Sequence, residues 1–115
     1  MTSIDLLKFM LPDFLVDYFD IVSAFNTEEH LHLHFEEKAK PPKEFDSLEL
    51  VSKGFLDEIT IQDFPLRGKY VYSHIKRRRW TDKTTGEIIK RDWQLVAKGT
   101  RMTHEFASFL KEINR

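Results

Sequence analysis

Apolar residues recur at helical spacing at both ends of the chain. Ser3 can cap a first helix, and Pro12 suits the first turn of a second, short one. Their apolar positions share one face: Ile4, Leu7, Leu11, Phe14, Leu15, Tyr18 and Phe19. We therefore predict a broken helix over residues 3–19. A last helix within residues 100–114, capped by Thr103, would carry the apolar stripe Phe106, Phe109, Leu110 and Ile113.

The period changes from helical to alternating in residues 20–37. DIVSAF, NTEE and HLHLHFEE together predict a β-hairpin. In the second arm, strand geometry places Leu31, Leu33 and Phe35 on one face. The opposite face then carries His30, His32 and His34.

The middle of the chain predicts a loop followed by three antiparallel strands. Residues 38–45, KAKPPKEF, form a polar loop, and the next stretch holds Gly54 as a turn but predicts no firm element. Strands are predicted at residues 57–64, 69–80 and 87–96. Turns at 65–68 and 81–86 would join them into a meander.

These elements predict an α+β fold, with helices at both ends of the chain packed on antiparallel strands. The 115 residues, 41% hydrophobic, suit a single domain. We divide it into acidic helices and hairpin (1–37), a loop region (38–54), a basic three-stranded meander (55–96) and the last helix (100–114). The lack of cysteine removes disulfides and thiolate metal sites. The lack of a membrane span or a basic leader predicts a cytoplasmic protein without a membrane partner.

Charge is strongly divided along the chain, although the net charge is only -1. Residues 1–65 hold 5 Lys against 14 Asp and Glu, a net of -9. Residues 66–115 hold 13 Lys and Arg against 5 acidic residues, a net of +8. Such a division favours a basic surface for nucleic acid or an acidic partner.

The basic residues concentrate on the predicted ribbon of residues 69–96. A two-stranded ribbon with cations on both faces fits a DNA major groove, and interleaved aromatic rings can stack on bases. The candidate DNA-binding residues are Arg67, Lys69, Lys76, Arg77, Arg78, Arg79, Trp80, Lys90, Arg91, Lys98 and Arg101. The alternative is a solvated strand tip whose charges block edge pairing. Trp80 and Trp93 are expected to pair across the two strands and stiffen the ribbon.

No catalytic or metal site is predicted, although two patterns partly match one. The three histidines of HLHLH could approach one metal ion, but His74 and His104 stand alone in other elements, so a polar strand face explains the alternation. Asp57, Glu58 and Asp63 flank a strand without a partner histidine or nucleophile. We therefore expect no cofactor, no metal and no enzymatic activity. A small metal protein using the histidine row stays as a third, weaker hypothesis.

Two longer stretches carry a family resemblance: EITIQDFPLRGKYVYSHIKRRRW and TGEIIKRDWQLVAKGTRMTHEFASFLKEI. They resemble the N-terminal region of bacterial insertion-sequence transposases, most closely the short first protein of IS-Aon-type elements, which are related to the ISL-three group. The signature is a D-x-P-x-x-G-K turn, a strand closing on R-R-R-W, and G-T-R-x-T before a helix. Its residues here are Asp63, Pro65, Gly68, Lys69, Arg77 to Trp80, Gly99, Thr100, Arg101 and Thr103.

The resemblance implies a zinc-ribbon-like domain, yet the zinc-binding cysteines are missing from this chain. It also implies a DNA-end recognition or accessory protein, since the acidic catalytic domain is not in this sequence. The expected partners are transposon terminal repeats and a separate catalytic transposase chain, and self-association stays open. The alternative function is a protein-interaction module that docks to that chain or to itself without binding DNA.

Overall fold

The computed structural model describes residues 11–66, 68–99 and 102–113, apart from the side chains of Asp63, Phe64 and Leu66. Within these residues the elements run, in order, as α2 (Asp13–Tyr18), β1 (Phe19–Asn26), β2 (His30–Glu37), the 3-10 turn η1 (Lys43–Phe45), β3 (Leu50–Phe55), β4 (Ile59–Leu66), β5 (Lys69–Lys76), β6 (Arg78–Asp82), β7 (Ile88–Lys90), α3 (Trp93–Lys98) and α4 (His104–Ile113). The fold is α+β with helices at both ends, as predicted.

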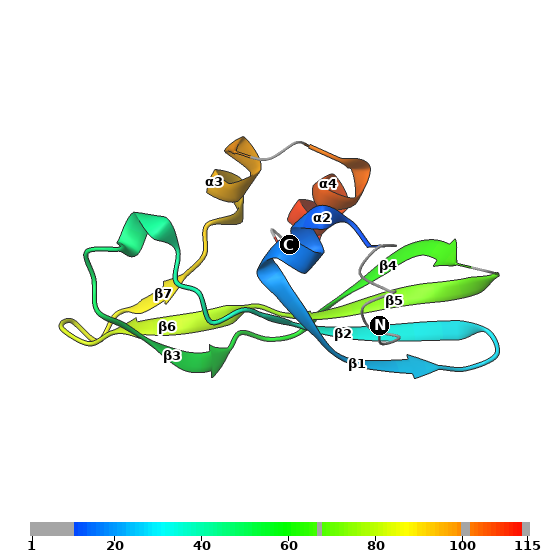
Figure 1. The fold of residues 1–115 in the computed structure, drawn as a ribbon, viewed down its shortest axis with the longest axis horizontal. Coiled ribbons are helices and arrows are strands. Elements are labelled where there is room, and N and C mark those ends of the chain that lie inside the picture. The colour runs from blue at the N-terminus through cyan, green and yellow to red at the C-terminus, as the bar shows by residue number, and fades with distance from the viewer. Residues whose placement is uncertain (1–10, 67, 100–101, 114–115) are drawn as a thin grey trace.

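The strands form two sheets that lie end to end along the longest axis of the molecule, which measures 49 × 30 × 25 Å (Figure 1). The larger sheet has the order β1-β2-β5-β4, and the smaller sheet has the order β3-β6-β7. The chain crosses between the two sheets from β2 to β3, from β3 to β4 and from β5 to β6. The pair β2–β5 is parallel, while the other pairs are antiparallel.

The hydrophobic core lies between the helices and one face of the larger sheet. From the sheet it receives Leu33, Phe35, Val71 and Ile75, all at most 2% exposed. From the helices and the strand joined to α2, aromatic rings pack tightly: Phe14 stacks on Phe106 at 4.6 Å, and Phe19 stacks on Trp93 at 5.5 Å between ring centroids. The described helices cover only this face, so within the described part of the chain the other face of the larger sheet is left uncovered.

Several predictions of local structure are confirmed. The hairpin of residues 20–37 is formed by β1 and β2 with Leu33 and Phe35 buried. Helix α4 begins where Thr103 Oγ1 accepts a hydrogen bond from the Phe106 amide at 3.1 Å, and it buries Phe106, Phe109 and Leu110. The short helix after Pro12 also forms. The first part of the predicted broken helix, with Ser3, Ile4 and Leu7, lies outside the described residues.

The predicted basic meander of residues 55–96 is wrong as one continuous sheet, although the antiparallel pairs on both sides of its two turns form, β4 with β5 and β6 with β7. The expected long strand of residues 69–80 is two strands, β5 and β6, which belong to different sheets and are separated at Arg77. The expected strand of residues 87–96 keeps only β7, because Asp92 ends it. The Asp92 carboxylate accepts hydrogen bonds from the amides of Gln94 and Leu95 and so caps α3.

The expected loop region of residues 38–54 contains a strand that the sequence did not predict. β3 pairs with β6, and Gly54 lies inside it with φ of 85° rather than in a turn between elements. The register shifts between Ser52 and Phe55, so Lys53 and Gly54 form a bulge opposite Arg79. A glycine in the left-handed region supplies the backbone conformation that the bulge needs.

Candidate functional site

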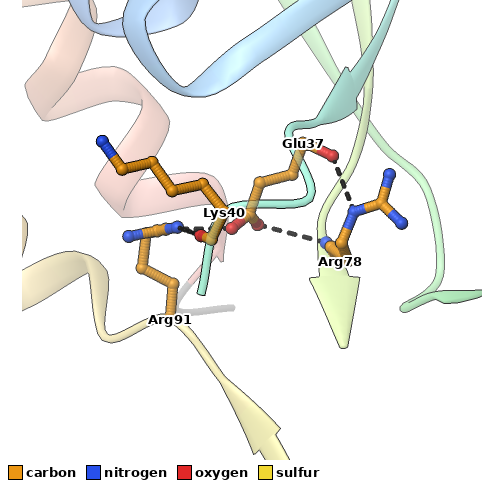
Figure 2. Close-up of polar contacts among 4 residues, drawn as sticks. All are labelled: Glu37, Lys40, Arg78 and Arg91. Carbon is orange, nitrogen blue, oxygen red and sulfur yellow. Dashed lines mark hydrogen bonds and ion pairs between the residues drawn. The ribbon is translucent and has the colours of Figure 1, made fainter. Parts of the chain in front are cut away.

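Glu37 is the centre of a buried polar junction between the two sheets (Figure 2). The Arg91 Nε donates to Glu37 Oε2 at 2.9 Å, and the Arg78 amide donates to Glu37 Oε1 at 3.1 Å. The Arg78 Nε in turn donates to the Glu37 carbonyl at 2.9 Å. Arg91 also donates to the Lys40 carbonyl at 2.5 Å. The end of β2 is thereby joined to the start of β6 and to the segment after β7.

Two charged groups near this junction have shifted pKa values because they are buried. Loss of hydration raises the pKa of Glu37, an effect opposed by the hydrogen bond and positive charge of Arg91 and by Arg78. Burial likewise lowers the pKa of Arg77, although Glu37 and Asp57 oppose that shift. The Arg77 Nε is buried without a hydrogen-bond partner. Arg78 and Arg91 therefore join the two sheets, and the side chain of Arg77 is partly buried rather than free in solvent.

Trp80 also belongs to the interior, so it is not placed to stack on bases. It is 1% exposed, and its cross-strand neighbour is Ile89. The predicted pairing of Trp80 with Trp93 is wrong, since Trp93 begins α3 and packs on Phe19 and Phe109 instead. Of the cations predicted to contact DNA, Arg78 and Arg91 are directed to the Glu37 junction, with Arg78 also over the Phe55 ring.

The opposite side of the smaller sheet carries cations toward solvent. Arg79 lies directly across from Lys90 in the β6–β7 register, and the alternation along β6 puts both on the side away from Trp80. The Arg79 Nε donates to the Lys53 carbonyl at 2.9 Å across the bulge. The next row on this side is Val51, Thr81 and Ile88, of which Ile88 is 63% exposed. We call Lys53, Arg79, Lys90 and this uncharged row the cationic face.

The remaining predicted DNA-binding residues are dispersed. The Lys69 Nζ donates to Asn26 Oδ1 at 2.5 Å and to the Thr27 carbonyl at 2.7 Å, which ties the tip of the first hairpin to β5. Lys76 ends β5 and Lys98 ends α3, both exposed. Arg67 and Arg101 lie outside the described residues. The structure therefore does not gather the predicted cations into one ribbon.

A second polar surface covers the open face of the larger sheet. The parallel register of β2 and β5 sets His30 opposite Tyr70, His32 opposite Tyr72 and His34 opposite His74. Their rings form a continuous row of contacts. Three pairs are stacked, with centroid distances of 5.2 Å for His32–Tyr72, 5.1 Å for His32–His74 and 4.5 Å for His34–His74. We call these residues the aromatic–histidine face.

His74 is the most connected member of this face. Its Nε2 lies 2.8 Å from His32 Nδ1, and its Nδ1 lies 3.1 Å from Thr60 Oγ1 and 3.5 Å from Glu58 Oε2. Burial and the neighbouring His34 lower the pKa of His74, Glu58 opposes them, and His32 adds to the lowering. The expectation that His74 stands alone, and that Glu58 has no partner histidine, is therefore wrong.

Sequence reasoning missed this cluster because it requires knowing which strands pair. The alternation HLHLH in β2 and YVYSH in β5 marks one polar face on each strand. Only the parallel β2–β5 pairing brings those two faces together, and a parallel neighbour is not predicted by hairpin signals.

Comparison of the chain with protein-family models, curated proteins and solved structures finds no match. Among the described residues, no helix is long and apolar enough to cross a membrane.

Proposed function

We propose that the chain is a non-catalytic DNA-binding module whose cationic face contacts DNA phosphates. Following the resemblance of its sequence, it would recognise the ends of an insertion sequence and act with a separate catalytic transposase. The observation that carries the proposal is the direct cross-strand pairing of Arg79 with Lys90. Like charges set opposite each other on a sheet destabilise the fold, and a bound phosphate would neutralise them.

The surroundings of this pair support an anionic ligand. Their described neighbours in the sheet register on the same side, Val51, Thr81 and Ile88, carry no charge to compensate them. Lys53 lies opposite Arg79 in the bulge and is exposed. Three cations on adjacent strands of one sheet suit a row of phosphates, and the exposed Ile88 adds an apolar contact beside them.

The proposed surface makes fewer contacts with DNA than the groove-filling basic ribbon that the sequence predicted. Arg78, Arg91 and Trp80 support the fold, so the binding surface reduces to Lys53, Arg79 and Lys90, with Lys76 as an exposed cation in the preceding strand. If three of these neutralise phosphates, log affinity should fall with log salt concentration at a slope of about -2.7.

Fluorescence anisotropy with labelled duplexes would test the proposal. One duplex is taken from the DNA that flanks the coding region, where the proposal expects a terminal inverted repeat, and a second has the same composition in scrambled order. The Arg79→Gln/Lys90→Gln variant should lose about tenfold or more in affinity, and its salt slope should become shallower by about two. A Lys43→Gln/Lys111→Gln variant, which removes the same charge from exposed sites elsewhere, is the matched control.

Three outcomes would contradict the proposal: no binding at low salt, equal losses in both variants, or an unchanged salt slope. Salt-sensitive self-association without DNA binding would instead favour the protein-interaction module. Preference for the terminal repeat over the scrambled duplex separates recognition of transposon ends from general DNA binding.

A further inference from the structure

We propose that His34, Glu58 and His74 form a binding site for a divalent transition-metal ion of the zinc class. The site lies on the aromatic–histidine face of the larger sheet, on other strands than the cationic face. It is independent of the proposed DNA-binding function.

The geometry brings three metal-ligating side chains together from three parts of the chain. His34 lies on β2, His74 lies on β5, and Glu58 directly precedes β4. One ligand atom from each lies within 4.8 Å of the other two. In a tetrahedral zinc site with bonds of about 2.0–2.1 Å, ligand atoms are about 3.4 Å apart. Binding would therefore draw the three groups closer and rotate the stacked His34 and His74 rings so that their nitrogen lone pairs converge on the ion.

Two of the ligands are fixed by the sheet itself. His34 and His74 are register partners in the parallel pair, and their rings lie nearly parallel at 12° with centroids 4.5 Å apart. Ligands held on neighbouring strands keep their separation better than ligands on loops. Glu58, next to the start of β4, is more exposed and supplies the negative charge that two imidazoles lack.

The hydrogen bonds of His74 already resemble those of a metal ligand. Its Nδ1 faces Glu58 Oε2 at 3.5 Å, while its Nε2 is hydrogen-bonded with His32 Nδ1 at 2.8 Å. A metal-bound histidine characteristically donates its second ring N–H to a neighbouring acceptor, which fixes the tautomer and the ring orientation. His32 would fill that role when His74 binds the ion through Nδ1. Thr60 Oγ1, now 3.1 Å from Nδ1, would turn toward another partner.

The ligand set selects the class of metal. Imidazole nitrogens suit zinc, copper and nickel, whereas calcium and magnesium prefer a shell of oxygens. Two histidines and one carboxylate leave a fourth position free in a tetrahedral site. The partial exposure of His34 and His74 gives the ion and a water molecule access from solvent.

Isothermal titration calorimetry with zinc chloride on the tag-free full chain tests the proposal. We expect one zinc ion per chain, and at least about tenfold weaker binding in His34→Gln, Glu58→Gln and His74→Gln. His30→Gln is the matched control, because His30 lies on the same strand face but outside the ligand set. Cobalt(II) provides a second readout, since its visible absorption reports tetrahedral nitrogen and oxygen ligation.

These measurements distinguish a specific three-residue zinc site from nonspecific zinc binding by surface histidines. Absence of zinc binding, or equal weakening by His30→Gln and His74→Gln, would overturn the proposal. Far-UV circular dichroism establishes that each variant is folded. If a histidine variant is unfolded, the zinc affinity of the exposed Glu58→Gln variant is the test. An unchanged zinc affinity in that variant would overturn the proposal. The Arg79→Gln/Lys90→Gln variant should keep its zinc affinity even if the DNA-binding proposal fails.

Discussion

Arg91 and Glu37 form an ion pair that is almost fully removed from solvent. The Nε–Oε2 distance is 2.9 Å, and the two side chains are 9% and 1% exposed. The Arg91 guanidinium also lies over the Tyr18 ring, 4.9 Å from its centroid. A residue just after β7 is thus anchored to the end of β2 and to α2. This contact joins the smaller sheet to the core of the larger one.

Replacing Arg91 should therefore destabilise the whole fold. In Arg91→Met the Glu37 carboxylate stays buried without its main counterion, and we expect a loss of about 3–5 kcal/mol in the free energy of unfolding. Urea denaturation followed by circular dichroism measures the loss. The neighbouring Lys90→Met, which changes an exposed cation on the cationic face, should stay within about 0.5 kcal/mol of wild type. Equal stability of the two variants would contradict the role given to the ion pair.

Gly54 offers a test of the bulge in β3. Its φ is 85°, and a Cβ at this position would meet nothing within 4 Å, so Gly54→Ala introduces backbone strain without a steric clash. We expect a loss of about 1–2 kcal/mol in unfolding free energy. Gly99→Ala is the control, because the φ of Gly99 is -98° and alanine adopts it freely. Comparable effects at both glycines would show that Gly54 does not need the left-handed conformation.

Local patterns predicted the elements that depend on nearby residues. The alternation in residues 30–35 and the stripe of Phe106, Phe109 and Leu110 are set by a strand or helix period, and both are confirmed. The division of residues 69–82 between two sheets could not be predicted. The buried face changes between Ile75 and Trp80, and the three consecutive arginines there offer no apolar position to mark the change. What separates β5 from β6 is pairing with distant strands, β2 and β4 on one side and β3 and β7 on the other.

The candidate surfaces were harder to predict for the same reason. Consecutive cations in the sequence predicted a ribbon that is basic on both faces, yet the cations on one side are directed into the Glu37 junction. Arg79 reaches the cationic face, while Arg78 turns to Glu37 and Ser52. The contact of His74 with His34 joins residues 40 positions apart in the sequence through a parallel pair. No local pattern carries that information.

Replacing Trp80 tests whether its side chain serves the stability of the fold or the binding of DNA. Trp80→Ala removes a side chain that is 1% exposed, and we expect it to cost about 3–5 kcal/mol in unfolding free energy. Ile88, which pairs with Thr81 on the opposite face of the same sheet, is 63% exposed, so Ile88→Ala should change stability by less than about 0.5 kcal/mol. Thermal and urea unfolding of both variants measure this difference. A stable Trp80→Ala protein that has lost only DNA binding would restore base stacking as the role of this ring.

The aromatic–histidine face should make stability depend on pH through His74. Its pKa in the folded protein lies below the ordinary value of 6.5, first because it is buried and then because of His34. The unfolded chain therefore binds this proton more readily than the folded one, and stability rises with pH in that range. The contribution is complete above 6.5 and is lost as the pH falls from 6.5 toward the lowered value.

The charged and titratable groups that act on His74 come from both neighbouring strands: His32 and His34 from β2, and Glu58 beside β4. Because Glu58 raises the pKa of His74, Glu58→Gln should steepen the loss of stability on acidification. His74→Gln should flatten it in the same range. Urea midpoints measured from about pH 5 to 8 in the presence of a chelator, which removes any bound metal, give the comparison. A pH profile that is identical in wild type and His74→Gln would show that another group titrates in this range.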